Sequence, residues 1–150
     1  MPHLVILYTA NLDRDTDMTA LCRGLADTML AQQDEDGKPV FPPGGTRVLA
    51  YPAPHYAVAD GGAAGRAAGT HTQGASGDAG DYAFAYLNLR MGRGRSDATK
   101  KRVGDALLAR AKAHFDPIFG RRRLGVTLQI DEGAEVFDAK HSNLHPLFKK

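Results

Sequence analysis

Proline at position 2 is the residue of this chain whose type and place suggest the most specific chemistry. Removal of Met1 would expose its ring nitrogen as a secondary amine, which can act as a base. The apolar run at residues 4–7 (LVIL) follows directly and predicts that the amine lies at the start of a buried strand. Pro2 is therefore a candidate general base.

An arginine in a glycine-rich turn offers a second kind of chemistry, the binding of anions. Arg95 lies in residues 92–96 (GRGRS), which we place between a strand and a helix. Its guanidinium can hold a carboxylate in a bidentate fork where the helix dipole also favours negative charge. A turn that simply needs glycine is the alternative. Nucleotide binding is disfavoured, because the segment lacks both the P-loop pattern and the third glycine of a dinucleotide fingerprint.

Other reactive side chains favour structural or solvated roles. The histidines show no metal-ligand spacing apart from His141 and His145, which have no carboxylate or thiol partner nearby, so we predict no metal site. Cys22 is the single cysteine, which excludes an internal disulfide, and we interpret it as a small buried hydrophobe. Residues 121–123 (RRR) are typical of a solvated turn, although one member could pair across a subunit boundary.

Length and composition predict one domain over residues 1–150. The chain is 43% hydrophobic and 24% charged, with a net charge of +2, which argues against nucleic acid as a partner. No stretch approaches the roughly 20 apolar residues of a membrane span, so we expect no membrane partner and a cytoplasmic location.

The first half of the chain predicts a β-α-β unit. Residues 3–8 are strand-like, and residues 47–51 (RVLAY) form a second candidate strand. Between them, apolar residues recur at helical spacing over residues 18–29, with residues 15–17 (DTD) available to cap the helix.

The second half repeats this pattern after a Gly/Ala-rich segment at about 60–80, which we interpret as a flexible surface loop. Residues 82–89 and 124–130 alternate as strands do. Ser96 can cap the helix between them, and Pro117 should end or bend that helix.

Two such units predict an α+β fold of order β-α-β-β-α-β. Right-handed crossovers place both helices on one face of a four-stranded mixed sheet. The other face has no helices of its own, so we expect it to be buried against other subunits, most simply in a closed ring.

Four segments together resemble the 5-carboxymethyl-2-hydroxymuconate isomerase family of the tautomerase superfamily. They are residues 1–3 (MPH), 81–84 (DYAF), 92–96 (GRGRS) and 143–149 (NLHPLFK). The resemblance implies a homotrimer of β-α-β-β-α-β subunits, an N-terminal proline base, no cofactor, and a role in the catabolism of homoprotocatechuate (3,4-dihydroxyphenylacetate).

The resemblance also implies roles for individual residues. Pro2 matches the catalytic proline, and Arg95 matches the arginine of the family's Gly-x-Gly-Arg-Ser turn. Arg47 matches the arginine region before the second strand, where the family pattern has two arginines separated by one residue and this chain has one. Arg93 replaces a small residue of the family turn and either adds a third cation or faces solvent. These arginines are the implied substrate-binding residues.

The implied substrate is a linear, unsaturated 2-hydroxy acid with several carboxylates. Pro2 would take the hydroxyl proton and return it to carbon, while Arg95 and Arg47 bind carboxylates, with no metal. A terminal amine has a pKa of about 7.7 to 8 and would be mostly protonated at neutral pH. One guanidinium about 6 Å away, at an effective dielectric of about 20, disfavours that proton by roughly 2.8 kcal/mol, or about two pKa units.

Two other functions remain open from the sequence. One is a non-catalytic trimer that binds small polycarboxylates with the same arginines. The other is a tautomerase of a different 2-hydroxydienoate or of an arylpyruvate enol.

Overall fold

Strands and helices follow one another along the chain in two similar halves. The computed structural model describes residues 2–68 and 81–148. Its long elements are β1 (His3–Thr9), α1 (Met18–Leu30), β2 (Arg47–Ala53), β3 (Tyr82–Gly92), α3 (Asp97–Phe119) and β4 (Arg123–Gly133). The short ones are η1 (Ala10–Arg14), η2 (Pro43–Gly45), α2 (Ala63–Ala68) and η3 (His145–Phe148). The long elements have the predicted β-α-β-β-α-β order.

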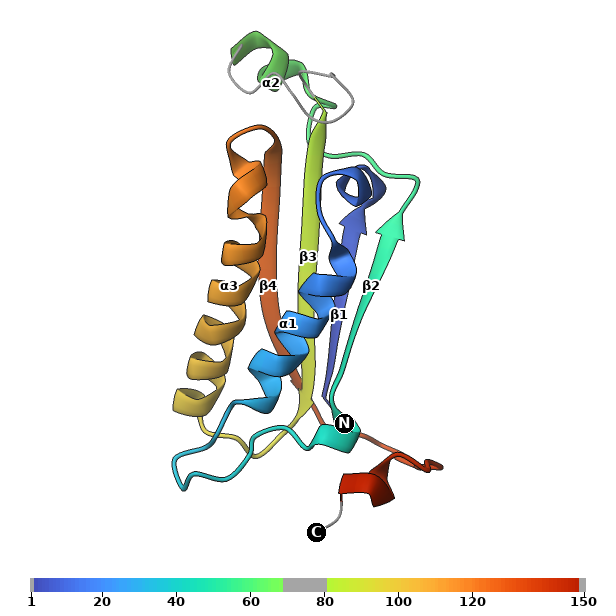
Figure 1. The fold of residues 1–150 in the computed structure, drawn as a ribbon, viewed down its shortest axis with the longest axis vertical. Helices are drawn as coiled ribbons and strands as arrows, with labels where there is room; N and C mark the ends of the chain where they lie inside the picture. The colour runs from blue at the N-terminus through green and yellow to red at the C-terminus, as the bar shows by residue number, and fades with distance from the viewer. Residues whose placement is uncertain (1, 69–80, 149–150) are drawn as a thin grey trace.

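The four strands form one mixed sheet in the order β2-β1-β3-β4. β1 runs parallel to β2 and antiparallel to β3, while β3 runs parallel to β4. The first strand of the chain is therefore a central strand with hydrogen-bonded partners on both sides (Figure 1). The predicted mixed sheet is confirmed.

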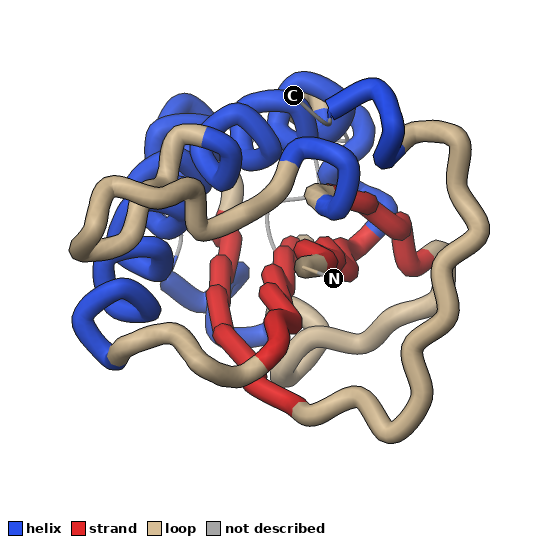
Figure 2. Tube along the Cα trace, turned by 90° about the horizontal axis from the view of Figure 1, so that it is seen from below, coloured by secondary structure: helices blue, strands red, loops and turns tan. Residues whose placement is uncertain are grey.

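Both long helices cover the same face of this sheet, as Figures 1 and 2 show. Leu4 and Ile6 of β1 are fully buried on this face of the sheet. Leu107 and Phe115 of α3 are also fully buried. The helices begin at the predicted caps. The side chain of Asp17 accepts a hydrogen bond from the N–H of Ala20, and the Ser96 hydroxyl accepts one from the N–H of Thr99, each at 3.0 Å.

The opposite face has no helix over it in the described part of the chain. Alternate residues of the strands point there, and several are large and apolar: Leu7, Leu49 and Tyr51 are 49%, 44% and 50% exposed. We call this surface the helix-free face. Its exposed apolar side chains fit the expectation that it contacts other subunits.

Two element boundaries differ from those expected from the sequence. Pro117 does not end α3, which continues to Phe119, because Ile118 is buried in the core and holds the last turn in place. Residues 63–68 of the expected flexible loop form the short helix α2, whose start is held by Asp60, since its carboxylate accepts hydrogen bonds from the N–H groups of Gly62 and Ala64. Residues 69–80 of that loop lie outside the described residues.

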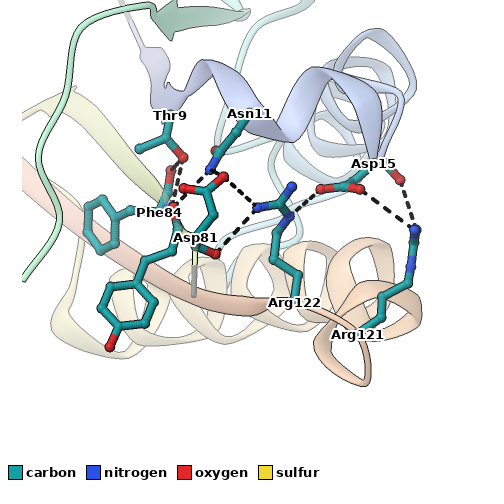
Figure 3. Close-up of polar contacts among 8 residues, drawn as sticks. Thr9, Asn11, Asp15, Asp81, Phe84, Arg121 and Arg122 are labelled. Carbon is teal, nitrogen blue, oxygen red and sulfur yellow. Dashed lines mark hydrogen bonds and ion pairs between the residues drawn. The ribbon is translucent and has the colours of Figure 1, made fainter. Parts of the chain in front are cut away.

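Arg122 is buried, so the prediction of a solvated arginine turn is wrong for this residue. Only 3% of its surface is exposed, and its guanidinium pairs with Asp15 and, at 3.2 Å, with Asp81 (Figure 3). Asn11 donates a second hydrogen bond to Asp81 at 2.8 Å. The run of three arginines does not reveal this burial, because the two carboxylates that pair with Arg122 are distant in the chain. The side chain of the neighbouring Arg121 remains 45% exposed.

Candidate active site

The strand directions bring Pro2 and the start of β2 to one end of the sheet. β1 and β2 are parallel, so both begin there, and the antiparallel β3 ends there (Figure 1). Pro2 is buried directly before β1. The turn that carries Arg93 and Arg95 follows β3 and belongs to the same end of the molecule. The topology thus gathers residues from three separate parts of the chain.

A row of three basic side chains crosses the sheet beside Pro2. His3 pairs with Arg47 on β2 and with Arg90 on β3. Directly paired residues point to the same face of a sheet, and neighbouring strands lie about 4.8 Å apart. The three side chains therefore lie together on the helix-free face. Partial burial and the nearby Arg47 lower the pKa of His3, which keeps this ring neutral at neutral pH.

Two cavities border this basic row. One, of about 260 Å³, is lined by His3, Arg90, Met91, Gly133, Glu135 and Asp138. The other, of about 360 Å³, is lined by Arg47 and residues 139–145. A substrate in the first cavity would meet the guanidinium of Arg90 on β3, and a substrate in the second would meet that of Arg47 on β2. Both strands are neighbours of β1.

The segment after β4 forms the rim of both cavities. A Cβ atom at Gly92 would lie 3.9 Å from a carboxylate oxygen of Glu135, so the segment first passes over the end of β3. Further along, a Cβ atom at Gly44 would lie 3.3 Å from the Cα of His145, which places η3 against η2. This segment therefore crosses from the end of β4 to the start of β2.

Carboxylates on this segment bring negative charge to the first cavity. A backbone hydrogen bond lowers the pKa of Glu135, and a hydrogen bond from Lys140 lowers the pKa of Asp138. Both groups are consequently ionised at neutral pH. The cavity beside His3 presents charges of both signs, with Arg90 as its guanidinium.

Arg95 lies in a tight turn, and its guanidinium already donates two hydrogen bonds. One terminal nitrogen donates to the carbonyl of Gly92 at 2.9 Å, and the other donates to the carbonyl of Val40 at 3.0 Å. The guanidinium carbon also lies 5.7 Å from the centre of the Phe41 ring. Gly94 has a φ of 106°, a conformation that favours glycine, so this turn confirms the need for glycine.

The predicted site residues are thus partly brought together. Pro2 and Arg47 lie at the same sheet end, on adjacent strands, and Arg95 lies in the turn that follows β3. Arg93, in that turn, is exposed. The roles of Arg93 and Arg95 in carboxylate binding stay predictions.

Arg90 and His3 were not singled out by sequence reasoning. Arg90 is the charged residue of β3, and its place beside His3 is known only once β1 is paired with β3. Alternation could have placed Arg90 on the same face as Tyr86 and Asn88, but not beside His3.

Cys22 and the histidines of the described part of the chain give no sign of a second reactive centre. Cys22 is half-buried against the core, and this burial raises the pKa of its thiol, which fits the structural interpretation. Within residues 2–68 and 81–148, no group of three or more His, Cys, Asp or Glu side chains is arranged to hold a metal ion. No helix in the same ranges has the length and apolar character needed to cross a bilayer.

A sequence model of a protein family matches nearly the whole chain, including Pro2 and the three residues of the basic row. The sequence model described as "5-carboxymethyl-2-hydroxymuconate isomerase" matches residues 2–148. The chain belongs to the 5-carboxymethyl-2-hydroxymuconate isomerase family. The resemblance seen in the sequence is therefore confirmed.

Relatives of known structure or activity support membership of the 5-carboxymethyl-2-hydroxymuconate isomerase family. A crystal structure of a 5-carboxymethyl-2-hydroxymuconate delta-isomerase is 63% identical, with a TM-score of 0.91, and the match covers 100% of this chain and 94% of that one. A family member from Deinococcus radiodurans R1 is 34% identical, with a TM-score of 0.75 and coverage of 99% and 95%. The Escherichia coli delta-isomerase is 26% identical over 99% of this chain and 100% of its own length.

More distant structures share the fold of the 5-carboxymethyl-2-hydroxymuconate isomerase family. A fused 4-OT described as an asymmetric trimer is 17% identical, with a TM-score of 0.54, and the match covers 98% of this chain and 99% of that one. This likeness confirms the tautomerase-like arrangement of strands and helices.

Proposed function

We propose that this protein is a 5-carboxymethyl-2-hydroxymuconate delta-isomerase that uses Pro2 as its general base and acid. One observation carries the proposal: a protein of that name is 63% identical across the whole of this chain. The burial of Pro2 at the head of a central strand, beside two arginines on neighbouring strands, supplies groups that suit the reaction.

The reaction moves one proton and one set of double bonds. The neutral ring nitrogen of Pro2, freed by removal of Met1, takes the proton from the 2-hydroxyl group. The C–O bond becomes a carbonyl, the electrons shift along the diene, and the ammonium of Pro2 returns the proton to the distant carbon. The conjugated ketone forms without gain or loss of atoms, and the base is regenerated.

Cations of the basic row prepare the base and bind the substrate. Arg47 is paired in register with His3, the residue next to Pro2, so its positive charge disfavours a second positive charge on the Pro2 nitrogen. The burial of Pro2 acts in the same direction. Arg47 and Arg90 bind carboxylates of the substrate from opposite sides of His3 and stabilise negative charge that develops on oxygen.

The proposal includes a homotrimer assembled through the helix-free face. Leu7, Leu49 and Tyr51 leave apolar surface exposed there, and a face of this kind is stable in water only when covered. A closed ring of three copies covers the same patch on each subunit. The fused 4-OT with this fold is also a trimer.

The physiological setting is proposed on the same basis. The substrate named for the relatives is a ring-opened aromatic compound with several carboxylates. We place the activity in the cytoplasmic catabolism of homoprotocatechuate.

The test follows the ultraviolet absorbance of 5-carboxymethyl-2-hydroxymuconate with protein shown by mass spectrometry to lack Met1. We expect rapid ketonisation by this protein and a loss of at least about 100-fold in kcat for Pro2→Ala. Pro54→Ala, which changes an exposed proline after β2, is the matched control and should retain full activity. Equal rates for the first two proteins would refute the role of Pro2, and no ketonisation by either would refute the proposed activity.

A further inference from the structure

The connection between α1 and β2, residues 31–46, folds back on itself before it reaches the candidate site. The N–H of Asp34 donates to the carbonyl of Lys38 at 2.8 Å, and the N–H of Val40 donates to the carbonyl of Gln32 at 2.9 Å. Val40 and Phe41 are 6% and 1% exposed. We call this segment the α1–β2 loop. Its buried end leads directly into the residues before Arg47.

Side chains at the start of α3 bind this loop. Both Ser96 and Thr99 donate hydrogen bonds to the carboxylate of Glu35, the latter at 2.9 Å, and the side chain of Arg102 donates to the carbonyl of Gln33. The hydrogen bond from Ser96 lowers the pKa of Glu35, so the group is ionised at the positive end of the α3 dipole. None of these contacts involves a residue that lines the two cavities.

Arg95 makes the contact nearest to the candidate site. It ties its own turn, through the carbonyl of Gly92, to the α1–β2 loop, through the carbonyl of Val40, and it lies over the ring of Phe41. Both terminal nitrogens of the guanidinium are engaged with backbone carbonyls. Its two hydrogen bonds thus join two parts of the protein.

Val40 is followed along the chain by residues 42–47, which are joined by local hydrogen bonds. The carbonyl of Pro42 accepts from the N–H of Gly45 at 3.0 Å and from the hydroxyl of Thr46 at 2.9 Å. The carbonyl of Gly44 accepts from the guanidinium of Arg47 at 3.4 Å. The end of the α1–β2 loop therefore contacts the guanidinium of Arg47 as well as leading into its backbone.

We propose that Arg95 is a positioning residue, whose guanidinium fastens the α1–β2 loop to the β3–α3 turn and so fixes Arg47 beside Pro2. This inference rests on the proposed function in giving Arg47 a role in catalysis. It assigns the arginine of the Gly-x-Gly-Arg-Ser turn an action through Arg47 in place of direct contact with a carboxylate. A displacement of about 1 Å at such a site is enough to reduce the rate about 100-fold.

The kinetic test compares single variants and one double-mutant cycle. Arg95→Ala should lower kcat/KM about 10- to 100-fold, and Glu35→Ala, which cuts the same loop from α3 without touching a cavity, should lower it in the same direction. Adding Arg95→Ala to Arg47→Ala should cost less than about twofold, because the first change acts through the second residue. Lys38→Ala removes an exposed cation from the same loop and should have no effect.

The opposite results would overturn the proposal. An arginine that binds the substrate directly would raise KM on its own, would multiply with Arg47→Ala, and would leave Glu35→Ala fully active. Arg95→Lys and Glu35→Gln keep the size of each side chain and serve where the alanine variants fold poorly.

A readout without substrate separates this inference from the proposed activity. Hydrogen exchange at the N–H of Val40 should accelerate at least about tenfold in Arg95→Ala and remain unchanged in Lys38→Ala, because the fastening is lost only in the former. Unchanged exchange in Arg95→Ala would refute the positioning role even if the wild-type protein isomerises the substrate. Accelerated exchange in a protein that is inactive on the substrate would leave the fastening established and the proposed function refuted.

Discussion

At the residue scale, the basic row controls which groups beside Pro2 carry a proton. His3 lies between two arginines in the register of the sheet, and partial burial together with Arg47 lowers its pKa. A cation disfavours a second positive charge close by, whether on an imidazole or on an amine. His3 therefore reports the electrostatic conditions that the Pro2 nitrogen experiences.

We predict that Arg47→Ala raises the pKa of His3. The change removes the charge contribution and leaves the larger contribution from burial, so the pKa should move only part of the way toward its ordinary value. An NMR titration of the His3 ring measures it. Arg23→Ala, which removes an exposed cation on α1, is the control and should not alter the titration. An identical His3 titration in Arg47→Ala would contradict the prediction.

Residue types were readable from the sequence, while their contacts were not. Pro2 could be recognised as a candidate base because that interpretation needs only its position after Met1 and the apolar run that follows it. Arg95 was interpreted as an anion-binding residue, and its hydrogen bond to the carbonyl of Val40 was not foreseen because it depends on how the α1–β2 loop docks, which no local pattern encodes. Arg90 was missed because its place beside His3 depends on strand register.

At the scale of elements, α1 and α3 meet through a hydrogen bond as well as through apolar packing. Thr16, just before α1, lies 2.6 Å from the Nε2 of His114 on α3. Burial, and then the charge of Arg110, lowers the pKa of His114, while Asp17 has a weaker opposite effect. The neutral ring is thus the form that fits between the helices.

We predict that stability falls as the pH is lowered from about 7.5 to 5.5, and that His114→Gln reduces this fall. The unfolded chain takes up a proton near the ordinary pKa of about 6.5, whereas the folded protein takes it up only at lower pH. Proton uptake therefore stabilises the unfolded state first as the pH decreases, and the free energy of unfolding falls by at most about 1.4 kcal/mol per pH unit for one group.

Urea unfolding at several pH values measures the effect of His114. His3, whose pKa is also lowered, should leave some of the pH dependence in place. Carboxylates such as Glu35 lose their stabilising effect below about pH 4.5, outside this window. The same slope of stability against pH in wild type and His114→Gln would show that the ring is not responsible.

Sequence patterns predicted these elements well where apolar spacing was regular. The caps Asp17 and Ser96 and the alternation in β3 and β4 are local signals that the structure preserves. The end of α3 was not predictable from Pro117, because the burial of Ile118 outweighs the hydrogen bond that a proline removes near a helix end. Helix α2 was hidden by a glycine-rich composition.

At the scale of the whole molecule, the buried ion pair of Arg122 joins elements far apart in the sequence. Arg122 and Asp15 each have side chains only 1% exposed, and Arg122 also pairs with Asp81 before β3. A buried charge that loses its partner is costly because it cannot regain its hydration. This network therefore stabilises the end of the sheet opposite Pro2.

We predict that Arg122→Ala lowers the free energy of unfolding by about 3–5 kcal/mol, since it leaves the carboxylate of Asp15 buried and largely uncompensated. Arg121→Ala, next to it and 45% exposed, should cost less than about 1 kcal/mol. Urea unfolding of the two variants provides the comparison. Similar losses for both would mean that burial of Arg122 contributes little.

We predict that Leu49→Asp on the helix-free face separates the proposed trimer into monomers. A charged group in place of a 44% exposed leucine would have to be desolvated when the subunits meet. Light scattering coupled to size-exclusion chromatography measures the molar mass. Leu108→Asp, on the exposed side of α3, should leave it unchanged. A trimer that persists in Leu49→Asp would place the subunit contact elsewhere.

The central position of β1 has a consequence for how the protein is made. Both of its neighbours, β2 and β3, follow it in the chain, and His3 meets Arg90 only after about three-fifths of the sequence has been synthesised. At ordinary rates of translation this takes on the order of ten seconds. The nascent first strand lacks at least one of its two partners throughout that interval, which is when an aminopeptidase can reach the residue before Pro2. Maturation of the proposed base is thus expected to precede folding, and a chain that folds unprocessed would keep its proline as an ordinary peptide-bonded residue.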